Sequence, residues 1–565
     1  MTTKFFDNMT FRLLFQLYYP FLLAIIFVLA SCGGGGSGGE SNNISDNSPP
    51  VTAACIGDSN QIPTPTADVM ISGAITFDFI PHDTLSNGLD YSSVSVEPAR
   101  GVEVVLVNQN NVVINSTITD ENGVYFLIAP GSNDVCIRVN ARMLATGSPS
   151  WNFSVTDNTQ GNALYVLQGN LVNSGTTNSI RNLHASAGWG GSSYTAARSA
   201  APFAILDTVY EVIQLVLSEN PNTNFPDAEL RWSTRNNPSP GSLTDGDIDS
   251  SFYLAGNIYL LGDENNDTDE YDRHVIAHEL GHYFEDQFSR SDSMGGEHEE
   301  GDRLDMRVAF SEGFGNAFSA IVLGDPVYRD SLGNDQSLGF TIDVEDNGVV
   351  NPGWYSEASI QSILYDIYDA NNDGADTIND GFKSIYTVLT SASYRDAAQL
   401  TSAHLFFNEL KLQFPGLATH ADTLIAAQDF VVNDAVGNGE TNSAGSPLVL
   451  PLYDRIIVSG ASVEVCSINN FGLLNKLGNR QFVSFSVGTT GNYTISARRS
   501  SGLTASDPDI LLWQNGDLVA FSEKTIPNSE LLILTLDPGN YIAEVYEYEN
   551  LIGPGGNVCF DVTVN

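Results

Sequence analysis

The chain has 565 residues, and its 68 acidic against 23 basic side chains give a net charge of −45 and a pI near 4.1. A field this negative argues against nucleic acid and anionic membrane surfaces as binding partners. Two explanations of the carboxylates stay open: adaptation of a secreted protein to saline water, and oxygen-rich calcium sites.

The amino-terminal residues carry a targeting pattern. Lys4 and Arg12 precede an apolar run at 22–29, and small residues then lead to Cys32. The run is short for a stable membrane span. The pattern resembles a bacterial lipoprotein signal, which implies that residues 1–31 are removed and that Cys32 becomes the acylated first residue, anchoring the protein to a membrane. An uncleaved membrane anchor is the alternative.

The segment that follows has no apolar surface to bury. Residues 32–54 are rich in Gly and Ser and predict a flexible tether. Gly33 rather than Asp follows the cysteine. By resemblance to the sorting rule of Gram-negative lipoproteins, this implies an outer-membrane lipoprotein, on the periplasmic face or at the cell surface.

Cysteine usage fits an oxidising compartment. Of the 5 cysteines, 4 remain when Cys32 carries the lipid, and they bracket the two ends of the chain. We predict disulfides between Cys55 and Cys136 and between Cys466 and Cys559, although four cysteines allow three pairings.

Residues 55–145 alternate apolar and polar side chains between Gly and Asn turns, which predicts an antiparallel β-sandwich. The run TDENGVYF at 119–126 resembles the turn and strand of carboxypeptidase-regulatory or surface-protein B-type domains. Such modules serve as spacers or contact carbohydrate, and a spacer is the simpler interpretation.

Helical patterns dominate the region 150–445. An apolar stretch at 204–217 predicts a long helix, and the short strands ELRWST and NIYLLG follow it. Further helices are predicted in QSILYDIYD, GFKSIYTVLT, SAHLFFNELKLQF and ADTLIAAQDF. This order predicts a mixed α+β lobe and a helical lobe with a cleft between them.

The pentapeptide His278-Glu279-Leu280-Gly281-His282 is the most specific signal in the chain. On a helix, residues four apart lie on one face, so both imidazoles can reach one metal ion while Glu279 projects beside them. Two histidines and a glutamate in this spacing are typical of zinc hydrolases. Two surface histidines on an ordinary helix are the alternative.

A catalytic zinc takes three protein ligands and keeps a fourth position for water. We predict Glu312 as the third ligand, because it lies in RVAFSEGFGNAFSAIV, a second helical apolar pattern. Asn316 lies one turn further on the same face and is predicted to support a ligand histidine. The segment GGEHEEGD predicts a solvated loop. It holds the rival ligands Glu297, His298, Glu299 and Glu300.

HELGH followed by SEGFGNAF resembles the gluzincin metallopeptidases, in which a glutamate on a later helix completes the HExxH site. The spacing and the run Glu312-Gly313-Phe314 are most similar to the fungalysin-type branch, whose ligand helix reads EGxxD. Asn316 stands where that branch has an acidic residue, so a charge that raises ligand basicity is missing. The enhancin-like mucin-cleaving peptidases are the alternative assignment.

The resemblance implies that zinc held by His278, His282 and Glu312 activates a water molecule, with Glu279 as general base. Gluzincins also use a Tyr or His of the helical lobe to stabilise the oxyanion. Tyr355 is the candidate for this role, and His404 is the second choice. A buried core aromatic is the simpler interpretation of Tyr355.

Calcium is predicted from an acidic turn. Asp369, Asn371 and Asp373 resemble the opening of an EF-hand loop, and Asp380 stands where the closing glutamate would be. A solvated Asn/Asp turn is the alternative. Another acidic turn precedes the HELGH helix and contains Asp263, Asn265, Asp267 and Asp269.

Residues 455–565 read as strands separated by Gly, Pro and Asp clusters and predict a second β-sandwich. The runs SDPDI at 506–510 and LDPGNY at 536–541 resemble the bacterial pre-peptidase C-terminal domain, which accompanies secreted proteases. That resemblance implies an accessory module that can be removed during maturation.

Together these features predict a multidomain protein with an N-terminal β-sandwich, an α+β zincin-like metallopeptidase domain with a helical C-terminal lobe, and a C-terminal β-sandwich. We predict a monomeric, extracytoplasmic zinc endopeptidase that cleaves protein or glycoprotein substrates. The alternative is a surface adhesin, or a matrix- or glycan-binding lipoprotein, whose metallopeptidase-like domain is weak or inactive.

Overall fold

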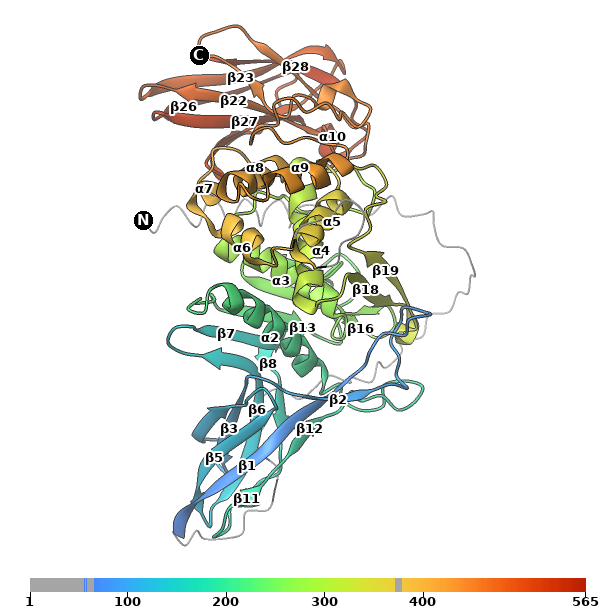
Figure 1. The fold of residues 1–565 in the computed structure, drawn as a ribbon, viewed down its shortest axis with the longest axis vertical. Coiled ribbons are helices and arrows are strands. Elements are labelled where there is room, and N and C mark those ends of the chain that lie inside the picture. Colours follow the sequence, from blue (N-terminus) through green and yellow to red (C-terminus); the bar gives the residue numbers. More distant parts are fainter. Residues whose placement is uncertain (1–54, 56, 58–65, 371–378) are drawn as a thin grey trace. The chain divides into compact units, whose positions relative to one another are not determined.

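The computed structural model describes Cys55, Gly57 and residues 66–370 and 379–565 (Figure 1). The predicted signal peptide 1–31, Cys32 and the tether 32–54 lie outside the described residues. The chain forms two compact units, one with the residues up to Leu280 and Arg329–Thr341, the other with Gly281–Tyr328 and Ile342–Asn565. The division falls inside one continuous helix, α3 (Arg273–Phe288).

The first unit is rich in strands. They are β1 (Thr66–Phe79), β2 (Ser95–Pro98), β3 (Val102–Asn108), β4 (Val113–Ile118), β5 (Val124–Gly131), β6 (Asp134–Ala145), β7 (Trp151–Asp157), β8 (Ala163–Leu164), β9 (Val166–Gln168), β10 (Val172–Asn173), β11 (Ser179–Ile180), β12 (Leu183–Ala185), β13 (Ala228–Trp232), β14 (Phe252–Leu254) and β15 (Asn257–Leu260). One sheet joins β1 to β2, β5, β11 and β12, and a ten-stranded sheet follows the path β14-β15-β13-β7-β6-β3-β4.

The N-terminal β module is stabilised as its sequence predicts. Strand β5 alternates between more buried and more exposed side chains, which is the pattern of a strand with one face in a core. The predicted disulfide between Cys55 and Cys136 is confirmed. The sheet does not stop at the expected boundary near residues 145–150, because β6 pairs with β7 and β7 pairs with β13.

Helix α2 (Ala201–Glu219) contains the stretch predicted to be helical and contacts β6 and β7. Its apolar residues Leu206, Val209 and Ile213 are buried. Among the described residues, α2 is the one helix long and apolar enough to cross a membrane, and a buried core helix has the same properties.

A small sheet has the order β16 (Gly262–Asp263), β17 (Asp267–Thr268), β18 (Val327–Leu332) and β19 (Leu338–Asp343). Strand β17 pairs antiparallel with β18, with Asp267 opposite Leu332. This pairing brings the acidic turn that precedes α3 close to β18, which begins about forty residues after α3 ends.

The second unit begins with helices. They are α4 (Met306–Leu323), α5 (Glu357–Tyr368), α6 (Lys383–Thr390), α7 (Ala392–Arg395), α8 (Ala403–Gln413) and α9 (Ala418–Ala427). The helices predicted in the four segments after residue 355 are confirmed as α5, α6, α8 and α9. Phe284 of α3 lies with its ring centroid 5.7 Å from that of Phe318 on α4, inside an aromatic core.

Two sheets form the C-terminal part of this unit. Their strands are β20 (Asp454–Arg455), β21 (Val463–Ser467), β22 (Arg480–Val487), β23 (Gly491–Gly502), β24 (Pro508–Gln514), β25 (Asp517–Ser522), β26 (Ser529–Leu536), β27 (Gly539–Glu547) and β28 (Val558–Val564), with the short helix α10 (Glu549–Ile552) before β28. The orders are β20-β22-β27-β24-β25 and β21-β28-β23-β26. Both contribute to one apolar core, so the predicted β-sandwich is confirmed, as is the disulfide between Cys466 and Cys559.

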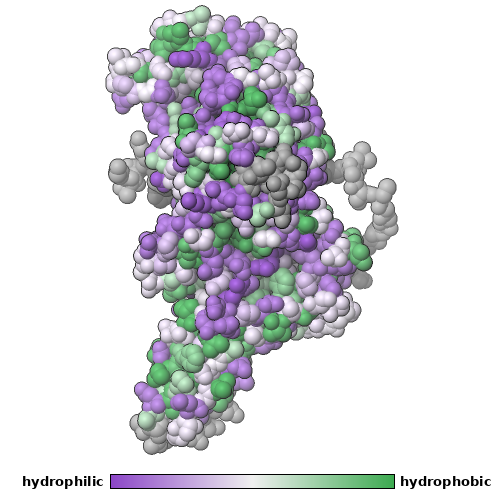
Figure 2. Space-filling model, viewed as in Figure 1, coloured by the Kyte–Doolittle hydropathy of each residue, from purple (hydrophilic) through white to green (hydrophobic). Residues whose placement is uncertain are grey.

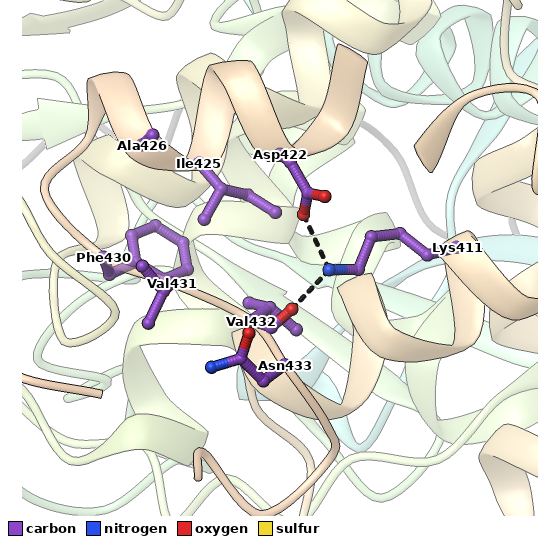
Figure 3. Close-up of a pocket in the computed structure, with 8 residues that line it drawn as sticks. All are labelled: Lys411, Asp422, Ile425, Ala426, Phe430, Val431, Val432 and Asn433. Carbon is purple, nitrogen blue, oxygen red and sulfur yellow. Dashed lines mark hydrogen bonds and ion pairs between the residues drawn. The ribbon is translucent and has the colours of Figure 1, made fainter. Parts of the chain in front are cut away.

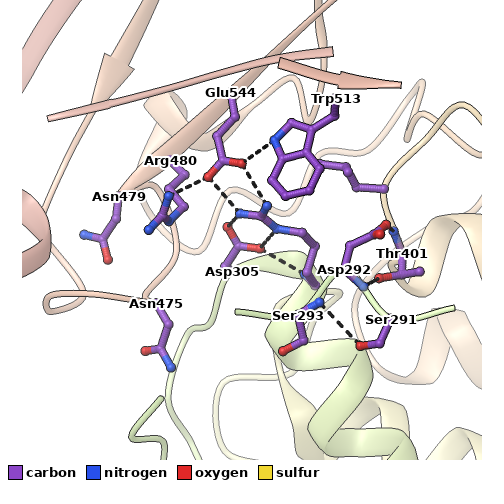
Figure 4. A network of polar contacts seen from close by, with 12 residues as sticks. Ser291, Asp292, Ser293, Asp305, Thr401, Asn475, Asn479, Arg480, Trp513 and Glu544 are labelled. Carbon is purple, nitrogen blue, oxygen red and sulfur yellow. Dashed lines mark hydrogen bonds and ion pairs between the residues drawn. The ribbon is translucent and has the colours of Figure 1, made fainter. Parts of the chain in front are cut away.

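A buried ion-pair network joins α4 to this sandwich (Figure 4). Arg307, 1% exposed, donates from Nε to Asp305 (2.9 Å) and from Nη1 to Glu544 of β27 (2.9 Å). Arg480 donates to the other oxygen of Glu544 (2.6 Å). Burial opposes ionisation of Glu544, but the two arginines outweigh it and hold its pKa at about 2.

Hydrophilic residues cover much of the face drawn in Figure 2, as the net charge leads us to expect. The N-terminal β module is an exception. Its strands β4 and β5 expose the apolar side chains of Val113, Ile114, Phe126 and Ile128. These strands therefore keep an apolar surface in contact with solvent.

Candidate metal centre

Helix α3 carries the HELGH residues, so His278 and His282 lie one turn apart on one face. Gly281 between them allows a close helix contact. A Cβ at Gly281 would lie 3.2 Å from Gly315 Cα and 3.3 Å from the ring of Phe318, both on α4. A larger residue would therefore push away the helix that carries Glu312.

Asp305 caps the start of helix α4, where its side chain accepts a hydrogen bond from the backbone N–H of Arg307. On another side of α4, a Cβ at Gly313 would lie 2.7 Å from the carbonyl oxygen of Glu357 and from Ile360 Cβ, both on α5. The glycines flanking Phe314 thus let α4 pack closely against both α3 and α5. This packing fixes the depth of Glu312, which is 5% exposed.

The three predicted ligands come together. His278, His282 and Glu312 each offer a ligand atom, and these atoms lie within 4.8 Å of one another. His282 Nε2 is 3.2 Å from Glu312 Oε2, close to the separation of about 3.4 Å between ligand atoms of a tetrahedral zinc. Two imidazoles and one carboxylate fit a hydrolytic zinc ion.

A carboxylate that the sequence analysis did not consider supports His282. Glu285 Oε2 lies 3.4 Å from His282 Nδ1 and accepts a hydrogen bond from Ser311 Oγ (2.6 Å). Burial raises the pKa of Glu285, whereas His282 and Ser311 lower it. A carboxylate on the outer nitrogen of a ligand histidine fixes its tautomer and raises its basicity. The sequence could have indicated this contact, because Glu285 follows His282 by three residues on the same helix.

The predicted supporting residue, Asn316, contacts α5. Its Nδ2 donates a hydrogen bond to Gln361 Oε1 (2.9 Å), and the residue is buried. A contact between Asn316 and a ligand histidine stays a prediction. Asn316 carries no charge. The carboxylate next to a ligand histidine is that of Glu285.

His298 also reaches the site. The segment 291–299 has no regular structure, in agreement with the predicted loop. His298 Nε2 nevertheless lies 3.3 Å from Glu312 Oε2, and its Nδ1 lies 2.8 Å from Glu357 Oε2. Burial lowers the pKa of His298, but Glu312 and Glu357 more than offset this effect and raise it to about 11. His298, one of the rival ligands, therefore lies next to the predicted ligand Glu312.

The proposed oxyanion donors are engaged elsewhere. Tyr355 is 3% exposed, and its hydroxyl donates to Asn442 Oδ1 (3.0 Å) and lies 3.2 Å from Pro352 O. His404 is fully buried, with Nε2 3.5 Å from Glu440 Oε2. These contacts favour the core interpretation of Tyr355 that the sequence allowed, and they offer no support for an oxyanion role.

The calcium loop is described only in part. Asp369 ends α5, where its backbone N–H bonds Tyr365 O (2.9 Å), and the N–H of Asp380 bonds Ile367 O (3.1 Å). Asn371 and Asp373 lie outside the described residues, so calcium binding by this loop stays a prediction.

A cavity of 270 Å³ lies at α8 and α9 (Figure 3). Lys411 Nζ lies 2.7 Å from Asp422 Oδ1 there and also contacts the carbonyl oxygen of Val432. The lining residues include none of the three clustered metal ligands. The cavity is therefore lined by other residues than the candidate metal centre.

Comparison with protein-family models finds one match. Residues 232–428 match the Mycolysin C-terminal domain. The matched segment holds α3, α4 and all three clustered ligands, although it is less than half of the chain. Together with the disulfides, the match supports a secreted, peptidase-related architecture. The finer assignment to a fungalysin-like or enhancin-like branch stays a prediction.

Solved structures give only weak likenesses. The pre-peptidase C-terminal domain of a collagenase from Bacillus anthracis is 19% identical, with a TM-score of 0.16, over 20% of this chain and 94% of that one. The surface-associated copper-binding protein CorA of Methylomicrobium album BG8 is 11% identical, with a TM-score of 0.16, over 20% and 99%. No curated relative matches the chain. At these TM-scores the likenesses carry no argument.

Proposed function

We propose that the chain is an extracytoplasmic zinc-dependent endopeptidase. The observation that carries the proposal is the clustering of His278, His282 and Glu312, whose ligand atoms lie within 4.8 Å of one another. This donor set is that of zinc hydrolases, which hold the ion with three protein ligands and keep one position open. Glu285 supports the second histidine in the way such sites require.

The chain supplies its own base beside these ligands. Bound zinc polarises a substrate carbonyl and lowers the pKa of water towards neutrality. Glu279 follows the first ligand histidine, is 7% exposed and is not among the clustered ligands. Its carboxylate takes a proton from the attacking water and delivers it to the nitrogen of the leaving amine.

We assign the oxyanion donor to His298 in place of Tyr355. The Nδ1 of His298 is held by Glu357 and its Nε2 is directed at Glu312. Both ring nitrogens lie within ion-pair distance of carboxylates, which raise the pKa of the ring in the metal-free protein and favour the imidazolium. A fixed cationic donor next to the ligand set stabilises negative charge that develops on a carbonyl oxygen.

The proposal extends to the cell envelope. The disulfides indicate an extracytoplasmic protein. We propose attachment to the outer membrane through a lipid on Cys32, with proteins or glycoproteins as substrates. The apolar surface of β4 and β5 favours a second candidate function, in which the N-terminal module binds a partner or the cell matrix.

Metal content tests the ligand set. We expect the purified full chain to carry about one zinc and to lose protein cleavage in 1,10-phenanthroline, with recovery on zinc addition. Glu312→Gln is expected to bind zinc at least about 10–100-fold more weakly, because a ligand is lost. Elemental analysis and casein cleavage are the measurements.

Glu299→Gln is the matched control, since Glu299 is an exposed rival ligand from the neighbouring loop. It should keep both zinc and activity. Loss of zinc in Glu299→Gln but not in Glu312→Gln would reverse the assignment. Stoichiometric zinc without cleavage of any protein or mucin would support the binding function.

Paired variants test the oxyanion donor. His298→Asn is expected to lower kcat/KM by about 10²–10³-fold while zinc content is kept, because one preorganised donor is removed. Tyr355→Phe should stay close to wild type, since its hydroxyl bonds Asn442 within the core. Steady-state kinetics on a peptide substrate decide between them, and a loss confined to Tyr355→Phe would refute the assignment.

A further inference from the structure

Four aspartates gather in the first unit, apart from the three HELGH-site ligands. Asp267, Asp269, Asp272 and Asp330 each offer one carboxylate oxygen, and these oxygens lie within 4.8 Å of one another. Asp267 lies on β17 and Asp269 just after it, while Asp272 immediately precedes α3. Asp330 lies on β18, the antiparallel neighbour of β17. Strand pairing therefore assembles the cluster from two distant segments.

The cluster is buried and incompletely satisfied. Asp269 is 2% and Asp272 0% exposed. The Oδ1 atoms of Asp330 and Asp267 are completely buried and have no hydrogen-bond partner among the described residues. Buried polar atoms in folded proteins are nearly always paired with protein, water or an ion. Two unpaired, buried carboxylate oxygens on members of one cluster of acids therefore point to a missing cationic partner.

Neighbouring side chains and backbone groups already bind some of the carboxylates in and next to this cluster. Asp272 accepts a hydrogen bond from the Ser331 backbone N–H (2.9 Å), and His82 Nε2 lies 2.8 Å from its other oxygen. Asp269 accepts a hydrogen bond from the Ser251 hydroxyl. The adjacent Glu270 is paired with the buried Arg198. These contacts hold the carboxylates in position without supplying a partner to the free oxygens of Asp267 and Asp330.

The close approach of the four aspartates makes their ionised state unfavourable unless a cation lies among them. The four carboxylates, with oxygens within 4.8 Å of one another, repel one another when they are ionised, and Asp269 and Asp272 are almost fully buried. A divalent cation among these oxygens would replace the mutual repulsion by attraction.

We infer that Asp267, Asp269, Asp272 and Asp330 form a calcium site. All the donors are carboxylate oxygens, the ligands that Ca²⁺ prefers. Calcium–oxygen distances of about 2.3–2.6 Å let two ligands across one ion lie up to about 5 Å apart. The span of the four oxygens fits within this limit. Magnesium needs a tighter octahedron and usually keeps several waters, so we assign calcium.

The position of the site gives it a role. Asp272 immediately precedes the helix that carries HELGH, and its carbonyl oxygen accepts the N–H of Ile276 (3.1 Å). Asp330 lies on β18, which follows α4 in the chain. A calcium ion bound by both would fix the first turn of α3 to this strand. It is a structural ion, distinct from the proposed zinc.

Direct binding to the full chain tests the inference. After dialysis in millimolar CaCl2 or MgCl2, elemental analysis and isothermal titration are expected to give at least one saturable calcium per chain in addition to zinc, with weaker magnesium binding. Asp330→Asn should weaken calcium binding by at least about 10–100-fold. The matched control Asp245→Asn, at an exposed aspartate of the same unit, should bind calcium like wild type.

Thermal unfolding separates a metal site from a merely acidic core. Calcium should raise the Tm of wild type. Asp330→Asn should raise the Tm of the calcium-free protein, because one repelling charge is removed, and should abolish the further increase with calcium. Should Asp330→Asn fail to fold, Asp267→Asn takes its place with the same expectations. Absence of saturable calcium at millimolar concentration, equal affinity for magnesium, or unchanged calcium binding in both variants would overturn the inference.

Discussion

Replacing Glu279 by Gln is expected to lower kcat by about 10²–10⁴-fold, the contribution typical of a positioned general base. The amide keeps the size and shape of the carboxylate but cannot accept a proton at neutral pH. Zinc content should stay unchanged, because the clustered ligands are His278, His282 and Glu312. Cleavage of casein and of a fluorogenic peptide, normalised to zinc per chain, measures the effect.

Asp286→Asn is the control for this variant. Asp286 lies on the same helix but is exposed, and it is one turn beyond the ligand histidines. We expect its activity to stay near that of wild type. If Glu279→Gln cleaves as fast as Asp286→Asn with zinc fully bound, Glu279 is not the base. If Glu279→Gln loses zinc, the residue is a ligand and the proposed division of roles is wrong.

The centre of the site was predictable because its chemistry is local in sequence. Helical geometry alone places His278 and His282 on one face. Glu312 is distant in sequence, so its place beside the histidines depends on the packing of α4 against α3. The glycines of GHY and EGFGN indicate such packing. A Cβ at Gly281 would crowd Gly315 on α4, and a Cβ at Gly313 would clash with α5. A glycine inside a helix is unfavourable unless packing requires it, so these glycines predict close contacts between helices.

The supporting residues were harder to predict. Glu285 looked like one of many surface acids, in a chain with 68 of them, and only burial reveals its contact with His282. His298 lies in a loop without periodicity, so no sequence pattern indicates which way it faces. The antiparallel pairing of β17 with β18 likewise decides that Asp330 meets Asp267. Such long-range pairings depend on the whole fold.

The C-terminal module also has a role that its resemblance did not suggest. Asn475 Nδ2 donates to the carbonyl oxygens of Gly295 (3.0 Å) and Glu297 (3.2 Å), and Lys476 Nζ donates to the latter (2.7 Å). These bonds hold the loop that carries His298. A module that only accompanies a protease would not need them. The segment just before β22 is therefore part of the support of the site.

Arg307→Met is expected to destabilise the protein by about 3–5 kcal/mol, because it leaves Glu544 buried with one of its two cationic partners removed. Asp305 would lose the same partner. The ion pairs tie the start of α4 to Glu544 of β27 (Figure 4). Their loss should therefore also loosen the helix that carries Glu312. Urea unfolding of the full chain at neutral pH measures the change in free energy.

The pH dependence has a definite sign. The folded-state pKa of Glu544, at about 2, is below its ordinary value of 4.5, so its ion pairs stabilise the fold above pH 4.5. This contribution is lost as the pH falls towards 2. The difference between wild type and Arg307→Met should therefore be full at pH 7 and decrease below pH 4.5.

Asp422→Asn is the matched control, since it breaks the ion pair with Lys411 at a side chain that is 56% exposed. Water screens that pair, so we expect a change of at most about 1 kcal/mol. Equal destabilisation by the two variants would mean that burial does not decide the strength of these ion pairs. A stable Arg307→Met would show that the network is dispensable for joining α4 to the sandwich, and the C-terminal module would then be free to act as a removable accessory.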